Sequence, residues 1–159
     1  MDDALAGELL DARLIATLAT LNGDGSIHLV AMWFLWDGEA VLIPTSRATR
    51  KVRNVERDPR ATVMVDDSRG GFDLRGITLV GRAEIERGEA ALELNRRVHL
   101  KYVTGEGLAL EPVRRYLSTD DVTIRFMPER MSSWDLAATE QARILAAGRL
   151  YLPLVPRLG

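Results

Sequence analysis

Residues 28–65 read HLVAMWFLWDGEAVLIPTSRATRKVRNVERDPRATVMV, and this stretch decides the fold. It alternates apolar runs with turn residues, which is the pattern of short strands joined by tight connections. The pattern predicts, in order, a strand over 28–36, a turn at Asp37-Gly38, a strand over 40–43, a helix and a strand over 61–65.

The helix of this stretch has clear ends. Pro44 interrupts the strand pattern, and Ser46 or Thr49 is a suitable N-cap. Asp58-Pro59 ends the helix, because the residue before a proline disfavours helical backbone.

The sequence outside this stretch extends the same pattern. It predicts further strands over 14–21, 74–86 and 121–127, and further helices over 2–13, 89–102 and near 136–147. Mostly antiparallel strands with a few helices predict a mainly β small barrel in one domain over 1–159, with a peripheral tail from about 137. No Gly-x-Gly-x-x-Gly or Walker motif supports a standard nucleotide fold.

The strand over 28–36 is apolar on both faces. Val30, Met32, Phe34 and Trp36 alternate with Leu29, Ala31, Trp33 and Leu35. One face fills a barrel, and the other needs a cover. The protein's own helices, a second subunit or a flat ligand would each serve.

Composition excludes several kinds of chemistry. The 159 residues contain no Cys, which rules out a disulfide scaffold, a Cys-ligated zinc and a thiol nucleophile. His28 and His99 lie outside any metal pattern, so we expect no metal site and interpret both as surface or satisfied polar residues. We expect no signal peptide and no membrane span, hence a cytoplasmic protein.

A basic segment stands out on an acidic chain. Residues 47–60 hold six cations and two acids, whereas the whole chain has a net charge of −2. One compact basic patch suits a small anion better than duplex nucleic acid. Helix N-terminal N–H groups and hydroxyls beside Arg50 and Lys51 indicate phosphate binding. A solvated helix face is the alternative interpretation.

The pattern Thr45, Thr49, Arg50, Lys51, Asn54, Val55, Asp58, Pro59, together with the aromatic strand before it and the late SSWD, resembles the flavin-binding split-barrel superfamily. These are the pyridoxamine 5′-phosphate oxidase-like proteins, in particular the actinobacterial flavin/deazaflavin oxidoreductases. The resemblance covers roughly residues 5–136. It implies a six-stranded antiparallel split β-barrel flanked by short helices, and a homodimer with two cofactor sites at the subunit interface.

The resemblance also implies which residues bind the cofactor. The phosphate would lie on Thr45, Ser46, Thr49, Arg50 and Lys51, in the motif that includes Asn54. The strand residues Met32, Trp33 and Phe34 would line the tricyclic ring. Trp134 would approach the ring bound by the other subunit. No catalytic residue is assigned; solvent, His28 or Ser133 could supply a proton.

The chain departs from authentic pyridoxamine-phosphate oxidases, since it lacks their C-terminal Arg/His substrate site. It is closer to the deazaflavin users, and Arg47, Arg53 and Arg57 could serve the anionic tail of coenzyme F-420. We therefore expect an oxidoreductase that uses coenzyme F-420 to transfer a hydride to a small unsaturated or conjugated acceptor. An FMN-dependent reductase or oxidase, a non-catalytic cofactor-binding protein and a single-stranded nucleic-acid-binding barrel are the alternatives.

Overall fold

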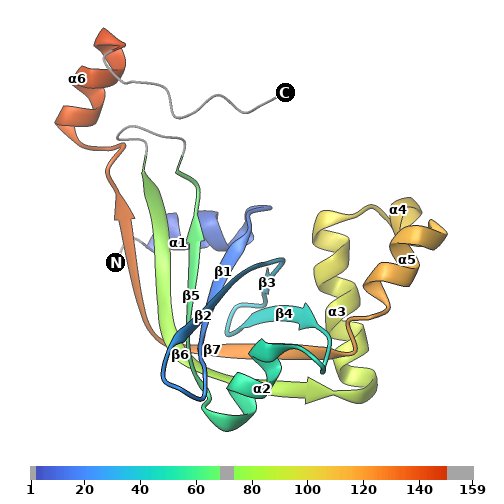
Figure 1. Ribbon diagram of the computed structural model, residues 1–159. Helices are drawn as coiled ribbons and strands as arrows, with labels where there is room; N and C mark the ends of the chain where they lie inside the picture. Colours follow the sequence, from blue (N-terminus) through green and yellow to red (C-terminus); the bar gives the residue numbers. More distant parts are fainter. Residues whose placement is uncertain (1–2, 69–73, 150–159) are drawn as a thin grey trace.

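A computed structural model describes residues 3–68 and 74–149 of the chain. Seven strands form one antiparallel sheet in the order β2-β1-β5-β6-β7-β4-β3, which does not close on itself. Figure 1 shows β6 and β7 bending strongly, with their upper halves beside β5 and their lower halves near β4 and α3. The strands are β1 (Ala16–Leu21), β2 (Ile27–Met32), β3 (Leu35–Trp36), β4 (Val41–Thr45), β5 (Arg60–Asp66), β6 (Arg75–Arg87) and β7 (Val122–Asp135).

The mainly β architecture with helices is confirmed, but the described sheet has seven strands where we expected six. The expected strand over 28–36 is broken between Met32 and Leu35. Phe34 lies fully buried at the break, and its backbone N–H donates to the hydroxyl of Tyr102 (3.3 Å) instead of to a neighbouring strand. A side chain from a distant helix thus replaces the sheet hydrogen bond.

β7 is also longer than expected. The sequence prediction ended at Met127, before Pro128, whereas the strand continues to Asp135. A register shift between Val80 and Gly81 places Pro128 opposite Gly81. Only glycine fits there, because a Cβ on Gly81 would overlap the Met127 carbonyl oxygen. A proline is tolerated in a strand at such a bulge.

The helices are α1 (Asp3–Asp11), α2 (Arg50–Arg57), α3 (Gly88–Tyr102), α4 (Gly105–Ala109), α5 (Glu111–Leu117) and α6 (Glu140–Gly148). Four of them match the expected helices closely, whereas the sequence patterns did not predict α4 and α5. Figure 1 shows α3, α4 and α5 gathered at one side of the sheet, and α6 beyond the far end of β7. Residues 150–159 of the expected tail lie outside the described residues.

The core lies between the inward face of the sheet and α1. Leu9 of α1 is 1% exposed and belongs to this core. The strands contribute alternate residues: Leu18, Val63, Val65, Ile77, Leu79, Ile124 and Phe126 are fully buried. A smaller cluster of Ala40, Leu42 and Val98 packs α3 against β4. The two clusters hold β4, and with it the segment that follows, in a fixed place.

Candidate cofactor-binding site

The segment from Thr45 to Lys51 joins the end of β4 to the start of α2. Thr49 is the N-cap of α2, but its side chain caps no backbone N–H. Its hydroxyl lies 3.4 Å from the hydroxyl of Thr45, which is 2% exposed. The Ser46 hydroxyl accepts from the N–H of Ala48 (3.4 Å). The first N–H groups of a helix lack partners within it, so this end of α2 presents donors to an anion.

Lys51 is only 8% exposed, so its side chain does not lie on a solvated face of α2. Its ammonium makes no hydrogen bond or ion pair with any described residue. Burial lowers the pKa of Lys51, and the charge of Asp120 opposes that shift. A mostly desolvated cation without a hydrogen-bonding partner is unfavourable, and an anionic ligand would relieve this.

The other cations of the basic segment are mostly engaged within the chain. Arg47 pairs with Asp121 through its side chain and its backbone N–H, and Arg53 donates to the carbonyl of Ala48 (3.1 Å). Arg57 donates to the Leu21 carbonyl and Arg60 pairs with Asp58. Among the described contacts, this leaves Arg50 and Lys51 as the cations of segment 47–60 without a hydrogen bond or ion pair. The expectation that Arg47, Arg53 and Arg57 extend the anion site is therefore not supported by their contacts.

Asn54 is buried and positions α2. Its amide nitrogen donates to the Thr20 hydroxyl (3.1 Å) and to the side-chain carbonyl of Asn22 (3.0 Å), and its own carbonyl accepts from Arg57 (3.3 Å). These bonds fix α2 to the β1–β2 hairpin. Asn54 therefore acts on the anion-binding segment through the placement of its helix.

A pocket of about 300 Å³ adjoins this segment. Met32 and Trp33 line it, as the family resemblance implies for the cofactor ring, whereas the Phe34 side chain does not reach it. Phe34 is 0% exposed because its ring packs in the core, 3.9 Å from the Lys101 ammonium. The full lining is Ala31, Met32, Trp33, Pro44, Tyr116, Leu117 and Asp120.

Two side chains of α3 pack against Trp33, which lines this pocket. Tyr102 stacks on Trp33, and the edge of His99 faces the Trp33 ring with centroids 6.3 Å apart. His99 Nε2 lies 3.0 Å from a carboxylate oxygen of Asp120. His99 is thus a buried and satisfied polar residue, as expected. Asp120 thus contacts His99 and also acts on Lys51, because its negative charge favours the charged form of that lysine.

A comparison with protein families matches residues 2–135 to pyridoxamine 5′-phosphate oxidase. The chain belongs to the pyridoxamine 5′-phosphate oxidase family. Its sheet, with the helices around it, is the split-barrel fold that its solved structural neighbours share.

Three proteins that are similar to this chain have different names. A conserved hypothetical protein of Mycobacterium tuberculosis, Rv2991, is 30% identical with a TM-score of 0.72, and 86% of each chain is covered. A solved structure named F420 reductase is also 30% identical, with a TM-score of 0.60 over 79% of this chain and 94% of its own. General stress protein 26 of Bacillus subtilis is 30% identical over 78 residues, which are 49% of this chain and 55% of that relative. The match therefore spans about half the length of that curated relative.

Trp134 lies near the end of β7 that is remote from the anion-binding segment. Thr45 pairs with Val122 at one end of β7, whereas Trp134 pairs with Gly76 near the other end. Twelve residues of strand separate the two positions, about 40 Å of extended chain. Its role at a cofactor bound by another subunit stays a prediction.

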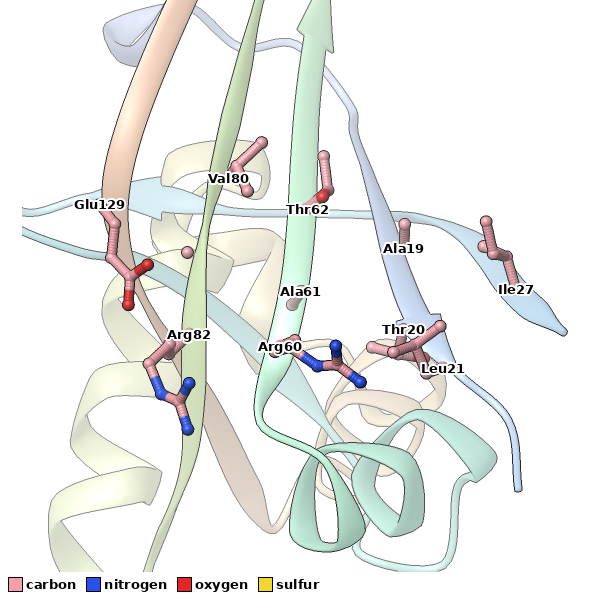
Figure 2. Close-up of a pocket in the computed structure, with 11 residues that line it drawn as sticks. Ala19, Thr20, Leu21, Ile27, Arg60, Ala61, Thr62, Val80, Arg82 and Glu129 are labelled. Atoms are coloured by element: carbon pink, nitrogen blue, oxygen red, sulfur yellow. The ribbon is translucent and has the colours of Figure 1, made fainter. Parts of the chain in front are cut away.

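A second hollow, of about 350 Å³, lies on the outward face of the sheet. Figure 2 shows the side chains of Arg60, Arg82 and Glu129 along β5, β6 and β7 at this hollow. Nearby on the same face, Ile27 and Leu29 of β2 are 65% and 63% exposed. The outward face is therefore apolar toward β2 and charged toward β7.

Sequence reasoning missed Tyr116, Asp120 and the supporting role of Tyr102. Tyr102 is the last residue of the helix expected over 89–102, and nothing local indicates that its hydroxyl reaches Leu14 and Phe34. Asp120 lies beside Asp121 in a turn, where acidic residues are common. Among the described residues no cluster of three metal-ligating side chains occurs, and no helix there is long and apolar enough to cross a membrane.

Proposed function

We propose that this protein is an oxidoreductase that binds coenzyme F-420 and transfers a hydride to a small unsaturated or conjugated acceptor. Its phosphate site is formed by Thr45, Ser46, Thr49, Arg50 and Lys51. Two copies of the chain share each cofactor site. The 30% identity to a protein named F420 reductase supports the choice of cofactor.

The observation that carries the proposal is that Lys51 is buried and its ammonium has no described hydrogen bond. Its side chain is mostly buried, its ammonium lacks a hydrogen-bonding partner among the described residues, and it lies one residue after Arg50 at a helix start without a side-chain cap. A phosphate fits this donor set of hydroxyls, backbone N–H groups and two cations. Binding an anion would raise the pKa of Lys51 again and hold it in the charged form.

The pocket beside this segment fits the flat part of the cofactor. Met32 and Trp33 provide an apolar wall, and the stack of Trp33 on Tyr102 keeps that wall rigid. When bound, coenzyme F-420 supplies the hydride. The contribution of the chain is to hold the ring against the acceptor and to exclude water.

A second copy of the chain completes the proposed site. Ile27 and Leu29 expose apolar side chains on β2, on the strand that leads to Met32 and Trp33. Large exposed apolar residues that gather on one face indicate a subunit contact. Trp134, remote from the site of its own chain, is then free to approach the ring held by the partner.

A binding titration tests the proposal. Purified protein is titrated with F-420, FMN and FAD, and binding is followed by cofactor fluorescence. Lys51→Met should weaken F-420 binding about ten- to a hundredfold, because a charge-assisted hydrogen bond to phosphate is lost. Arg82→Gln is the matched control, since Arg82 is an exposed cation without a described hydrogen bond or ion pair.

The variants also separate binding from folding. Lys51→Met should unfold at the same urea concentration as the wild type or at a higher one, because it removes a desolvated charge. Unchanged F-420 affinity in Lys51→Met would show that Lys51 does not bind the phosphate. A wild type that binds no cofactor would reject the function itself.

The contacts of Arg47, Arg53 and Arg57 favour FMN as the second candidate cofactor. These cations are engaged within the chain, and FMN needs only the phosphate site. Salt distinguishes the two, because exposed charge contacts are screened over ~8–10 Å. F-420 affinity that falls more steeply with salt than FMN affinity would support contacts to the anionic tail. Equal slopes with tighter FMN binding would support an FMN-dependent reductase or oxidase.

A further inference from the structure

The pocket has a second wall that the proposed function does not use. It comes from α5 and the turn after it, and consists of Tyr116, Leu117 and Asp120. Leu117 is the buried residue of α5, whereas Tyr116 beside it is 75% exposed. The Tyr116 ring therefore lines the pocket while most of its surface is open to solvent.

Asp120 is fixed in place from several sides. Its N–H donates to the Leu117 carbonyl (3.1 Å), and its own carbonyl accepts from Asn95 (2.9 Å). Oδ2 of its carboxylate lies 3.0 Å from His99 Nε2. The other oxygen, Oδ1, makes no hydrogen bond with a described residue. Asp120 lines the pocket, and Oδ1 is the carboxylate oxygen that its described contacts leave without a partner.

The charges around the pocket define what it accepts. Asp120 is the charged residue of its lining, and the nearby cation Lys51 belongs to the phosphate site. With a phosphate on Lys51, the local charge becomes more negative. A carboxylate placed beside Asp120 would meet like charge, which is unfavourable in a partly desolvated site.

We propose that Tyr116 and Asp120 form the acceptor subsite, which selects planar acceptors with a hydrogen-bond donor or a positive charge over acceptors with a carboxylate. This inference rests on the proposed function, because it assigns the acceptor to the part of the pocket that the cofactor leaves free. Tyr116 packs on the plane of the acceptor, and Asp120 accepts its hydrogen bond.

Two matched probes test the selection. They are 4-hydroxycinnamaldehyde and 4-carboxycinnamaldehyde, which share a planar conjugated aldehyde and differ in the para group. Their dissociation constants are measured by calorimetry on protein loaded with oxidised F-420, so that no hydride transfer occurs. Wild type should bind the hydroxyl probe at least tenfold more tightly than the carboxylate probe.

The variants assign this preference to residues. Asp120→Asn should remove most of the preference, because the charge is lost while an acceptor for His99 remains. Glu129→Gln, which removes a carboxylate from the other hollow, should leave the preference for the hydroxyl probe unchanged. Tyr116→Ala should weaken both probes about three- to tenfold, and Tyr116→Phe should restore them. Leu110→Ala, at a 61% exposed position that does not line the pocket, is the control.

The outcomes separate this inference from the proposed function. A wild type that binds F-420 but neither probe, or an Asp120→Asn variant that keeps the wild-type preference, overturns the subsite alone. Probe affinities that stay unchanged in Tyr116→Ala overturn the role of Tyr116. A wild type that binds neither F-420 nor FMN in the titration without probes overturns both proposals.

Discussion

The indole ring of Trp33 stacks on the phenol ring of Tyr102, with centroids 4.9 Å apart and ring planes 4° from parallel. The two residues are distant in sequence, and the stack joins the end of β2 to α3. The Tyr102 hydroxyl donates to the Leu14 carbonyl (2.6 Å), which is nearer to it than the Phe34 carbonyl (3.2 Å), and it accepts from the Phe34 N–H (3.3 Å). One helical side chain therefore holds both the wall of the pocket and the break in the strand.

Tyr102→Phe tests whether the Tyr102 hydroxyl stabilises the break between β2 and β3. The variant keeps the stack but leaves the Leu14 carbonyl and the Phe34 N–H without this partner, so we expect a loss of about 1–3 kcal/mol in the free energy of unfolding. Urea denaturation measures the change. Tyr116→Phe is the control, and at its exposed site the change should stay within about 0.5 kcal/mol. Equal stability of the two variants would contradict the assigned role of the hydroxyl.

Gly76 and Trp134 test the packing at the far end of β7. A Cβ on Gly76 would lie 2.7 Å from Cη2 of Trp134, so Gly76→Ala forces the indole to move. We expect a loss of about 1–3 kcal/mol. Adding Trp134→Ala should recover part of it, which a double-mutant cycle measures.

A control separates this clash from a general effect of alanine. Gly7 lies in α1 with no atom within 4 Å of its added Cβ, so Gly7→Ala should stabilise the protein by about 0.5–1 kcal/mol. Equal costs of Gly76→Ala with and without Trp134 would show that the indole is not the obstacle.

Leu29 tests the proposed assembly. We expect light scattering to give about twice 17.7 kDa for the wild type at micromolar concentration, and Leu29→Asp to shift it toward the mass of one chain. A charge in the apolar face of β2 would have to be buried in the contact. Leu110→Asp, at a similarly exposed position between α4 and α5, should leave the mass unchanged. A monomeric wild type that still binds cofactor would remove the shared site.

Lys101 tests a pH dependence of stability. Its ammonium donates to the Leu10 carbonyl (3.1 Å) beside the Phe34 ring, and burial lowers its pKa from 10.5 to about 8. Between these values the folded protein has released this proton while the unfolded chain retains it. The unfolded state then binds more protons, so the free energy of unfolding rises with pH over this range.

Urea denaturation at pH 7.5 and 9.5 measures this rise. Lys51 contributes in the same direction, since burial lowers its pKa as well. The increase should be smaller in Lys101→Met than in the wild type. An equal increase in both proteins would exclude Lys101 as its source.

Local features of the sequence were sufficient for several elements. The turn between β1 and β2 forms between the two expected strands: the Asn22 N–H donates to the Ser26 carbonyl (2.8 Å), and Gly25 has φ +83°. Thr49, one of the two expected N-cap residues, occupies the N-cap position of α2 although its side chain caps no N–H, and Asp58 ends the helix. These signals act within a few residues, so a reader of the sequence alone can evaluate them.

The candidate site divides in the same way. Local sequence was enough to indicate the segment from Thr45 to Lys51 as a candidate anion site, because hydroxyls and cations at a helix start attract anions wherever that helix lies. The burial of Lys51, the pairing of Arg47 with Asp121 and the place of Asp120 in the pocket lining follow only from the three-dimensional arrangement. Burial and pairing depend on elements far apart in the chain, here α2, α3 and the turn before β7, and no local pattern encodes which of them meet.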